Sequence, residues 1–133
     1  RDEIDVRAKK MEADLKDPDV EVRIAYSGRK MVAYCKIGPC KLPFDVGPEP
    51  ALELHRVYVY QAGQGVGVGR ILLAWAIERS RQRGAKNLFL GVWESNERAI
   101  ALYESRGFEK VGGYKFKVGD TLDDEFIMRL RLA

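Results

Sequence analysis

The sequence has few of the side chains that bind metals or form disulfide frameworks. Its 133 residues include two cysteines, Cys35 and Cys40, and one histidine, His55. A structural zinc site needs about four Cys or His ligands, and no second cysteine pair is present to complete one. We therefore predict no metal site, and we expect both cysteines to be reduced thiols in a cytoplasmic protein.

A long apolar segment and a strong net charge are also missing. The longest wholly apolar run, residues 71–77, is far shorter than the roughly 20 residues that span a bilayer. The charged start Arg1-Asp2-Glu3 does not resemble a signal peptide. The net charge is +3 and there is no basic block. We therefore predict neither a membrane nor a nucleic-acid partner.

The composition is sufficient for one packed domain. Hydrophobic residues make up 46% of the chain, enough for a packed core, and charged residues make up 32%, above the usual quarter, which favours a soluble chain. At roughly 100 to 200 residues per domain, residues 1–133 are expected to form a single domain.

Periodicity and turn residues divide the chain into alternating elements. Apolar residues at helical spacing predict a helix over residues 4–15, ended by Asp17-Pro18. Alternation predicts an antiparallel hairpin with strands at 20–24 and 31–37. The remaining predicted elements are a loop at 40–50, a strand at 52–60, a glycine-rich turn at 63–69, a helix at 68–83, an apolar strand at 87–93, a helix from Ser95 or Asn96 to Gly107, and a terminal hairpin around Gly119-Asp120.

The order strand, helix, apolar strand predicts a βαβ unit with two parallel strands and a right-handed crossover. The predicted fold class is therefore mixed α/β (α+β): antiparallel strands first, a central parallel pair joined by the crossover helix, and a C-terminal β-hairpin.

The glycine-rich turn lies where a strand meets a helix N-terminus, and free amides and the helix dipole can hold an anion there. Two common phosphate loops do not fit. No lysine with Ser or Thr follows Gly67 or Gly69, and the glycines lack the GxGxxG spacing. The alternative to an anion site is a tight strand-to-helix connection that binds nothing.

Two segments together resemble the GNAT superfamily of N-acetyltransferases. Gln64, Gly67 and Gly69 have the Q-x-x-G-x-G spacing of its acetyl-CoA pyrophosphate loop, and NERAIALYESRGF at 96–108 is similar to its following helix. The chain most resembles the PaiA-type spermidine/spermine acetyltransferases, through LELHRVYV at 52–59, GVWE at 91–94 and the turn at 118–120. The resemblance implies parallel strands that splay apart after Val59 and near Trp93. It also implies a first strand and helix that would be missing before residue 4.

The same resemblance implies acetyl-CoA as cosubstrate and a set of residues that bind it. Two strand valines would bind its pantetheine arm through their main chain, or else belong only to the core. Arg70 would pair with a phosphate, or be an ordinary surface charge; Asn96 would contact the cofactor, or only cap its helix. The implied set is Val57, Val59, Gln64, Gly65, Val66, Gly67, Val68, Gly69, Arg70, Asn96 and Tyr103.

Acetyl transfer from a thioester to an amine needs a base for the amine, a donor for the carbonyl oxygen and a proton for the thiolate. By the strand period of two, Glu53, His55, Val57 and Val59 share one face. The resemblance makes Glu53 the base, with His55 second; the alternative for Glu53 is pairing with a cation or lining the polyamine site. Tyr103 would protonate the thiolate, although its spacing alone indicates a core aromatic. The main-chain N–H of Val59 would polarise the carbonyl.

We therefore expect an acetyl-CoA-dependent N-acetyltransferase that acts by direct transfer in a ternary complex, with a polyamine or another small amine as acceptor. Acidic residues in the last hairpin, among them Asp120 and Glu125, could attract a polycation, although acids in turns are usually only solvated. The alternatives are a protein N-terminal or lysine acetyltransferase and a non-catalytic CoA-binding module. Pairing of the terminal hairpin with a second subunit would produce a homodimer.

Overall fold

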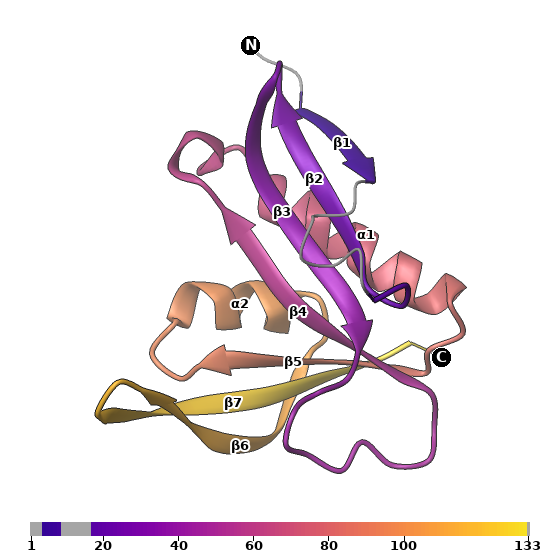
Figure 1. Cartoon of the computed structure of the whole chain (residues 1–133), viewed down its shortest axis with the longest axis vertical. Helices are drawn as coiled ribbons and strands as arrows, with labels where there is room; N and C mark the ends of the chain where they lie inside the picture. The colour runs from indigo at the N-terminus through magenta and orange to yellow at the C-terminus, as the bar shows by residue number, and fades with distance from the viewer. Residues whose placement is uncertain (1–3, 9–16, 133) are drawn as a thin grey trace.

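The computed structural model describes residues 4–8 and 17–132, and a seven-stranded mixed sheet forms its centre (Figure 1). The strand order is β1-β2-β3-β4-β5-β7-β6, and within these described ranges only β4 and β5 run parallel. The mixed fold class is confirmed. The strands are β1 Ile4–Ala8, β2 Glu21–Ser27, β3 Lys30–Pro39, β4 Ala51–Val59, β5 Asn87–Trp93, β6 Glu109–Val118 and β7 Thr121–Arg131.

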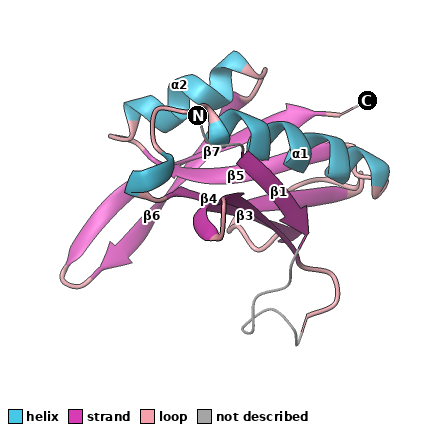
Figure 2. Cartoon of the chain, turned by 90° about the horizontal axis from the view of Figure 1, so that it is seen from above, coloured by secondary structure: helices cyan, strands magenta, loops and turns pink. Residues whose placement is uncertain are grey.

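Two helices, α1 Val68–Gln82 and α2 Glu97–Ser105, lie on the same side of the sheet, as Figure 2 shows. A short 3-10 turn, η2 Gln61–Gly63, precedes α1. We call this side the helix face; Leu72 and Leu73 of α1 are fully buried against it. No helix in the described part of the chain is long and apolar enough to cross a membrane.

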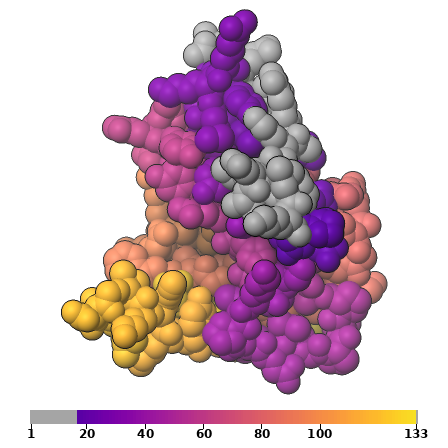
Figure 3. Space-filling model, in the orientation of Figure 1, coloured from indigo at the N-terminus to yellow at the C-terminus, as the bar shows by residue number. Residues whose placement is uncertain are grey.

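The opposite side, which we call the loop face, is partly covered by the loop at 40–50. The Phe44 ring of this loop lies 5.9 Å from the Phe89 ring of β5. A Cβ added at Gly112 of β6 would lie 2.8 Å from the Phe44 ring, so the loop crosses from β5 to β6. In Figure 3 the loop segment lies beside the projecting β6–β7 hairpin.

The helix predicted over residues 4–15 is wrong at its start. Residues Ile4–Ala8 form β1, which pairs antiparallel with β2 from Ile4↔Ser27 to Ala8↔Arg23. The rest of the predicted helix lies outside the described residues. The segment IDVRA also alternates apolar and polar residues, and the free edge of β2 provides the hydrogen-bond partners that select the strand.

The two parallel strands separate much earlier than predicted. β4 pairs with β5 only from Ala51↔Asn87 to Glu53↔Phe89, whereas the prediction placed the separation after Val59. Beyond this point β4 stays paired with β3, and β5 with β7. The edges of β4 and β5 that face each other therefore lack strand partners beyond Glu53 and Phe89.

A β-bulge at His55 changes which side chains share a face. β3 pairs Ile37 with Leu54 but Lys36 with Arg56, so His55 is an extra residue in β4. The bulge shifts the alternation by one position. Glu53 is therefore on the loop face, while Val57 and Val59 are on the helix face, opposite the buried Cys35 and Ala33. The prediction of one shared face is wrong, because the strand period of two does not continue through a bulge.

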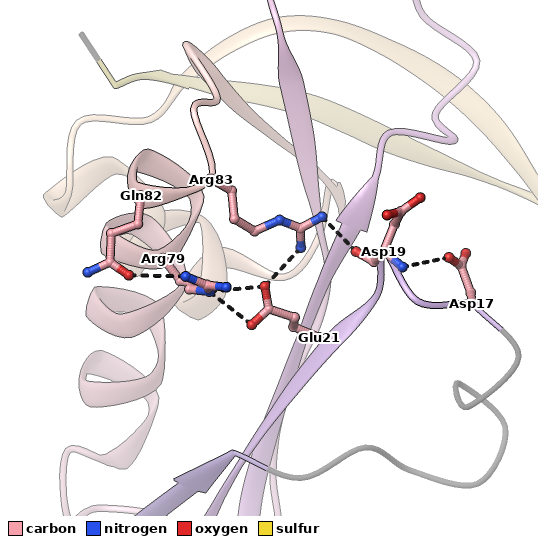
Figure 4. Close-up of polar contacts among 6 residues, drawn as sticks. All are labelled: Asp17, Asp19, Glu21, Arg79, Gln82 and Arg83. Atoms are coloured by element: carbon pink, nitrogen blue, oxygen red, sulfur yellow. Dashed lines mark hydrogen bonds and ion pairs between the residues drawn. The ribbon is translucent and has the colours of Figure 1, made fainter.

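The C-terminal end of α1 is fastened to β2 (Figure 4). The Glu21 carboxylate accepts hydrogen bonds from Arg79 Nε at 3.0 and 2.9 Å and from an Arg83 guanidinium nitrogen at 3.1 Å. Arg83 also donates to the Asp19 carbonyl at 2.8 Å. These contacts hold α1 in a defined orientation on the sheet, and with it the glycine-rich turn from which α1 starts.

Candidate active site

A cavity of about 610 Å³ lies on the helix face, between β4, the glycine-rich turn and α2. It opens beside the part of β4 that has no β5 partner. The residues that line it are Val57, Val59, Gly63, Gln64, Gly65, Gly67, Val68, Gly69, Arg70, Asn96, Arg98, Ala99, Ala101, Leu102 and Tyr103.

Every residue of the predicted cofactor set except Val66 lines this cavity; Val66 is 52% exposed on the turn. The structure therefore brings three distant parts of the sequence around one space. Sequence reasoning missed Gly63 and most of the α2 wall. Ala99 stands one helical turn before Tyr103, so spacing along α2 could have identified it. Arg98 carried no comparable signal.

The glycine-rich turn presents main-chain donors to the cavity. Gly65 and Gly67 have φ of +82° and +77°, a left-handed conformation that a side chain rarely adopts. Gly67 begins α1 without a side-chain cap, and the first turn of α1 has no acidic residue. Within the described part of the chain, the amides of residues 65–70 donate no hydrogen bond. Free donors of this kind, at the positive end of a helix dipole, are suited to holding an anion.

Two cations flank the same space from opposite walls. Arg70 lies in the first turn of α1 and Arg98 in the first turn of α2, and both are exposed. Neither has an ion-pair partner among the described residues. Their guanidinium groups are therefore free to pair with phosphates.

Asn96 caps α2: its side-chain oxygen accepts from the Ala99 N–H at 3.2 Å. It also lines the cavity, so the cap does not exclude a contact with a ligand.

Tyr103 is 9% exposed and its ring lies 5.7 Å from the Phe108 ring, which makes it a core residue as well as a cavity residue. Its hydroxyl makes no hydrogen bond to any described residue. Burial, with a smaller contribution from nearby Cys35, raises the pKa of Tyr103 to about 12. The phenol therefore keeps its proton throughout the physiological pH range.

Glu53 occupies the point where β4 and β5 part, on the loop face and outside the cavity lining. It is 8% exposed. One carboxylate oxygen accepts from the Lys41 N–H at 2.8 Å, and the other lies 3.4 Å from His55 Nδ1. The proposed base and the cofactor residues thus occupy opposite faces, but the separation of the strands begins directly beside Glu53.

Neither cysteine has the surroundings of a nucleophile. Cys35 is buried, and burial raises the pKa of its thiol to about 12. Burial also raises the pKa of Cys40. Among the described residues no group of His, Cys, Asp and Glu could hold a metal ion.

Comparison with known proteins gives the chain its family. The model of the acetyltransferase (GNAT) family matches residues 2–108. An uncharacterized N-acetyltransferase from Lactobacillus delbrueckii subsp. lactis is 36% identical over 89 residues, which are 67% of this chain and 51% of that protein. The chain thus spans about half the length of this relative.

Two solved structures are similar over most of the chain. The ribosomal-protein-alanine N-acetyltransferase from Brucella melitensis has 33% identity and a TM-score of 0.76, covering 91% of this chain and 74% of that one. YncA from Salmonella typhimurium, solved with its cofactor acetyl-CoA, has 27% identity and a TM-score of 0.72, covering 86% and 65%. The chain therefore belongs to the GNAT family of acetyltransferases.

Proposed function

We propose that this chain is an acetyl-CoA-dependent N-acetyltransferase that transfers the acetyl group directly to a primary amine. One observation carries the proposal: free amides of the turn, an unpaired strand edge and a buried phenol meet around a single cavity. A volume of about 610 Å³ is typical of pockets that enclose a ligand of cofactor size.

The residues present fit the parts of acetyl-CoA, which supplies the activated acetyl thioester. The amides of residues 65–70, with Arg70 and Arg98, would hold the phosphates. The unpaired edge of β4, at Val57 and Val59, would bind the amide groups of the pantetheine arm as a strand partner would. Tyr103 would stand at the sulfur end. Asn96 would contact the cofactor while it caps α2.

The acceptor amine would approach from the loop face, where Glu53 lies at the beginning of the separation. Glu53 is the proposed base for the ammonium proton, acting directly or through a water. The Val59 N–H is the proposed donor to the carbonyl oxygen, and Tyr103 the proposed donor to the departing thiolate. The bulge at His55 supports this division, because it leaves Glu53 on the loop face and Val57 and Val59 on the helix face.

For the acceptor we propose a polyamine or another small amine, as in the PaiA-type subgroup. Two carboxylates of β7, Glu125 and Asp123, support this acceptor. The pairing of Glu125 with Trp93 and of Asp123 with Phe116 indicates that both lie on the loop face, as Glu53 does. No cation among the described residues lies within ion-pair distance of either carboxylate. A second candidate acceptor is the N-terminal amine of a protein. The relative from Brucella melitensis, a ribosomal-protein-alanine N-acetyltransferase, favours this candidate.

Two finer proposals concern location and assembly. The free thiols of Cys35 and Cys40 support a cytoplasmic location.

The exposed Phe116, Val118 and Leu122 near the hairpin tip, on an edge strand and its neighbour, support a homodimer, which light scattering during gel filtration would test.

The deciding experiment incubates the protein with acetyl-CoA and a panel of amines, and follows both free CoA thiol and product mass. The panel contains spermidine, a monoamine, a lysine peptide and a peptide with an N-terminal alanine. Turnover that is fastest with spermidine supports the polyamine proposal, while turnover confined to one of the peptides replaces it with a protein acceptor. Tight acetyl-CoA binding with no thiol release from any amine would show a non-catalytic module.

A further inference from the structure

Glu53 and His55 form a nearly buried pair on the loop face. Their side chains are 10% and 15% exposed. The extra residue of the β4 bulge is His55 itself, and its imidazole lies over Gly38 of β3. A Cβ on Gly38 would be 3.3 Å from His55 Nε2 and 2.9 Å from a Val20 methyl group, so the absence of a side chain at this position makes room for the ring.

The hydrogen-bond partners define where the ring carries its proton. His55 Nε2 lies 2.9 Å from the Pro39 carbonyl oxygen. A carbonyl oxygen only accepts, so Nε2 must be the N–H nitrogen. In the neutral ring, Nδ1 then carries a lone pair and no hydrogen.

That lone pair faces a carboxylate. Glu53 Oε2 is 3.4 Å from Nδ1, while Glu53 Oε1 accepts from the Lys41 N–H at 2.8 Å. Without a proton between them, Oε2 and Nδ1 are two acceptors that repel each other in a place with little water. One added proton turns this repulsion into a hydrogen bond.

We propose that Glu53 and His55 act as one proton acceptor, and that the proton leaving the acceptor amine comes to rest between Glu53 Oε2 and His55 Nδ1. The inference rests on the proposed function, in which Glu53 is the base. His55 is a positioning residue: its Nε2–H on Pro39 fixes the ring, so that Nδ1 receives the proton that Glu53 takes up.

The protons balance over the whole reaction. A primary ammonium enters with three protons on nitrogen, and the amide product keeps one. The first proton passes to the Glu53–His55 pair and then to solvent, which leaves the nitrogen lone pair free to attack the thioester carbon. The second leaves the nitrogen as the C–S bond breaks and ends on the thiol of CoA.

Besides His55, two titratable groups among the described residues interact electrostatically with Glu53: Cys40, which follows β3, and Tyr114 of β6. Burial is the main cause that raises the pKa of each, so both are uncharged near neutral pH. Lys41 contacts Glu53 through its main-chain N–H.

The first test uses the wild-type chain without a histidine tag. His55 is its only histidine, so its imidazole nitrogens give a single set of signals in ¹⁵N NMR. We expect the Nε2–H form of the neutral ring, and a proton gained at Nδ1 on acidification. We also expect the protonation of Nδ1 and the acid limb of the kcat/KM profile to have the same midpoint, with kcat/KM calculated from the concentration of unprotonated amine. A neutral ring with its hydrogen on Nδ1, or two different midpoints, would overturn the proposal.

The second test is a double-mutant cycle. Glu53→Gln keeps an acceptor for Lys41 and should lower kcat about 100-fold. His55→Gln keeps a donor of suitable reach for Pro39 but removes Nδ1. It should lower kcat about tenfold and move the acid limb to lower pH, with the KM for acetyl-CoA and the Tm unchanged.

If the two residues work as a unit, the double variant is no slower than Glu53→Gln alone. Multiplied losses of about 1000-fold, or a wild-type pH profile in His55→Gln, would refute the pair. Glu49→Gln, a carboxylate change in the neighbouring loop, is the matched control and should leave the rate and the profile unchanged. A wild-type chain that acetylates no amine would instead refute the proposed function, and the NMR result would still decide the arrangement of the pair.

Discussion

Replacing Tyr103 with phenylalanine tests the chemistry of the cavity most directly. The folded phenol has a pKa of about 12, and a CoA thiol should resemble cysteine, near 8.5. Complete proton transfer to a free thiolate is therefore uphill by about 5 kcal/mol. Tyr103 is better suited to donate a hydrogen bond to sulfur while the negative charge develops.

The size of the effect follows from that role. A hydrogen bond to a charged group contributes about 1.5 to 3 kcal/mol. We therefore expect Tyr103→Phe to lower kcat about 10- to 160-fold. Because the phenol is protonated well beyond pH 10, the ratio of wild-type to variant rates should stay constant from pH 7 to 10.

The free energy of unfolding of Tyr103→Phe distinguishes a lost catalytic contact from lost packing. The Tyr103 hydroxyl has no hydrogen-bond partner among the described residues, and the Tyr103 ring packs against Phe108. Removing the oxygen should therefore change the free energy of unfolding by less than about 0.5 kcal/mol. Tyr58→Phe, on the exposed loop face, is the control. A folded Tyr103→Phe variant with a wild-type rate at neutral pH would refute the donor role.

Three further changes test the turn, the helix anchor and the buried thiol. Gly67→Ala forces a side chain into φ +77° and should cost about 1 to 2 kcal/mol of stability in urea unfolding. Gly67→Ala should also raise the KM for acetyl-CoA. The control Gly28→Ala, at φ +62° in the β2–β3 turn, should lower stability and leave this KM unchanged. If the two variants have the same KM, the proposed anion site is contradicted. Glu21→Gln weakens the contacts of residue 21 with Arg79 and Arg83 and should lower the free energy of unfolding by about 1 kcal/mol. The Tm should fall while kcat stays unchanged. An unchanged Tm would show that these contacts do not stabilise the protein. Cys35 has its pKa raised by burial from 9.0 to about 12, so the unfolded chain ionises first and stability is lost as pH rises above 9. At pH 10 Cys35 should lower the free energy of unfolding by about 1.4 kcal/mol. Denaturant unfolding at pH 7 and pH 10 should show this decrease in the wild type and not in Cys35→Ala. The same pH dependence in both proteins would contradict the raised pKa of Cys35.

Local signals predicted much of the fold. The apolar run at Asn87–Trp93 forms β5 with the predicted bounds, and α1 begins at Val68 as predicted. The turn glycines at 65 and 67 have the positive φ for which glycine is suited. These features depend on a few neighbouring residues, which is why reading the sequence alone could find them.

Other features depended on contacts far along the chain. Residues 4–8 form a strand because β2 offers them an edge, and the β4–β5 separation begins where β5 turns to pair only with β7. The bulge at His55 arises from the register of β4 on β3. It reversed the predicted placement of Glu53 relative to Val57 and Val59.

The sequence by itself determined the glycine-rich turn, the helices α1 and α2 and the residue types proposed for acetyl transfer, because helix propensity, glycine conformation and apolar periodicity are local properties. Only the tertiary structure decided on which face of the sheet each of these residues lies. Strand register, bulges and the end of a strand pair are set by hydrogen bonds between residues distant in the chain. A shift of one residue in that register moves a side chain to the other side of the sheet.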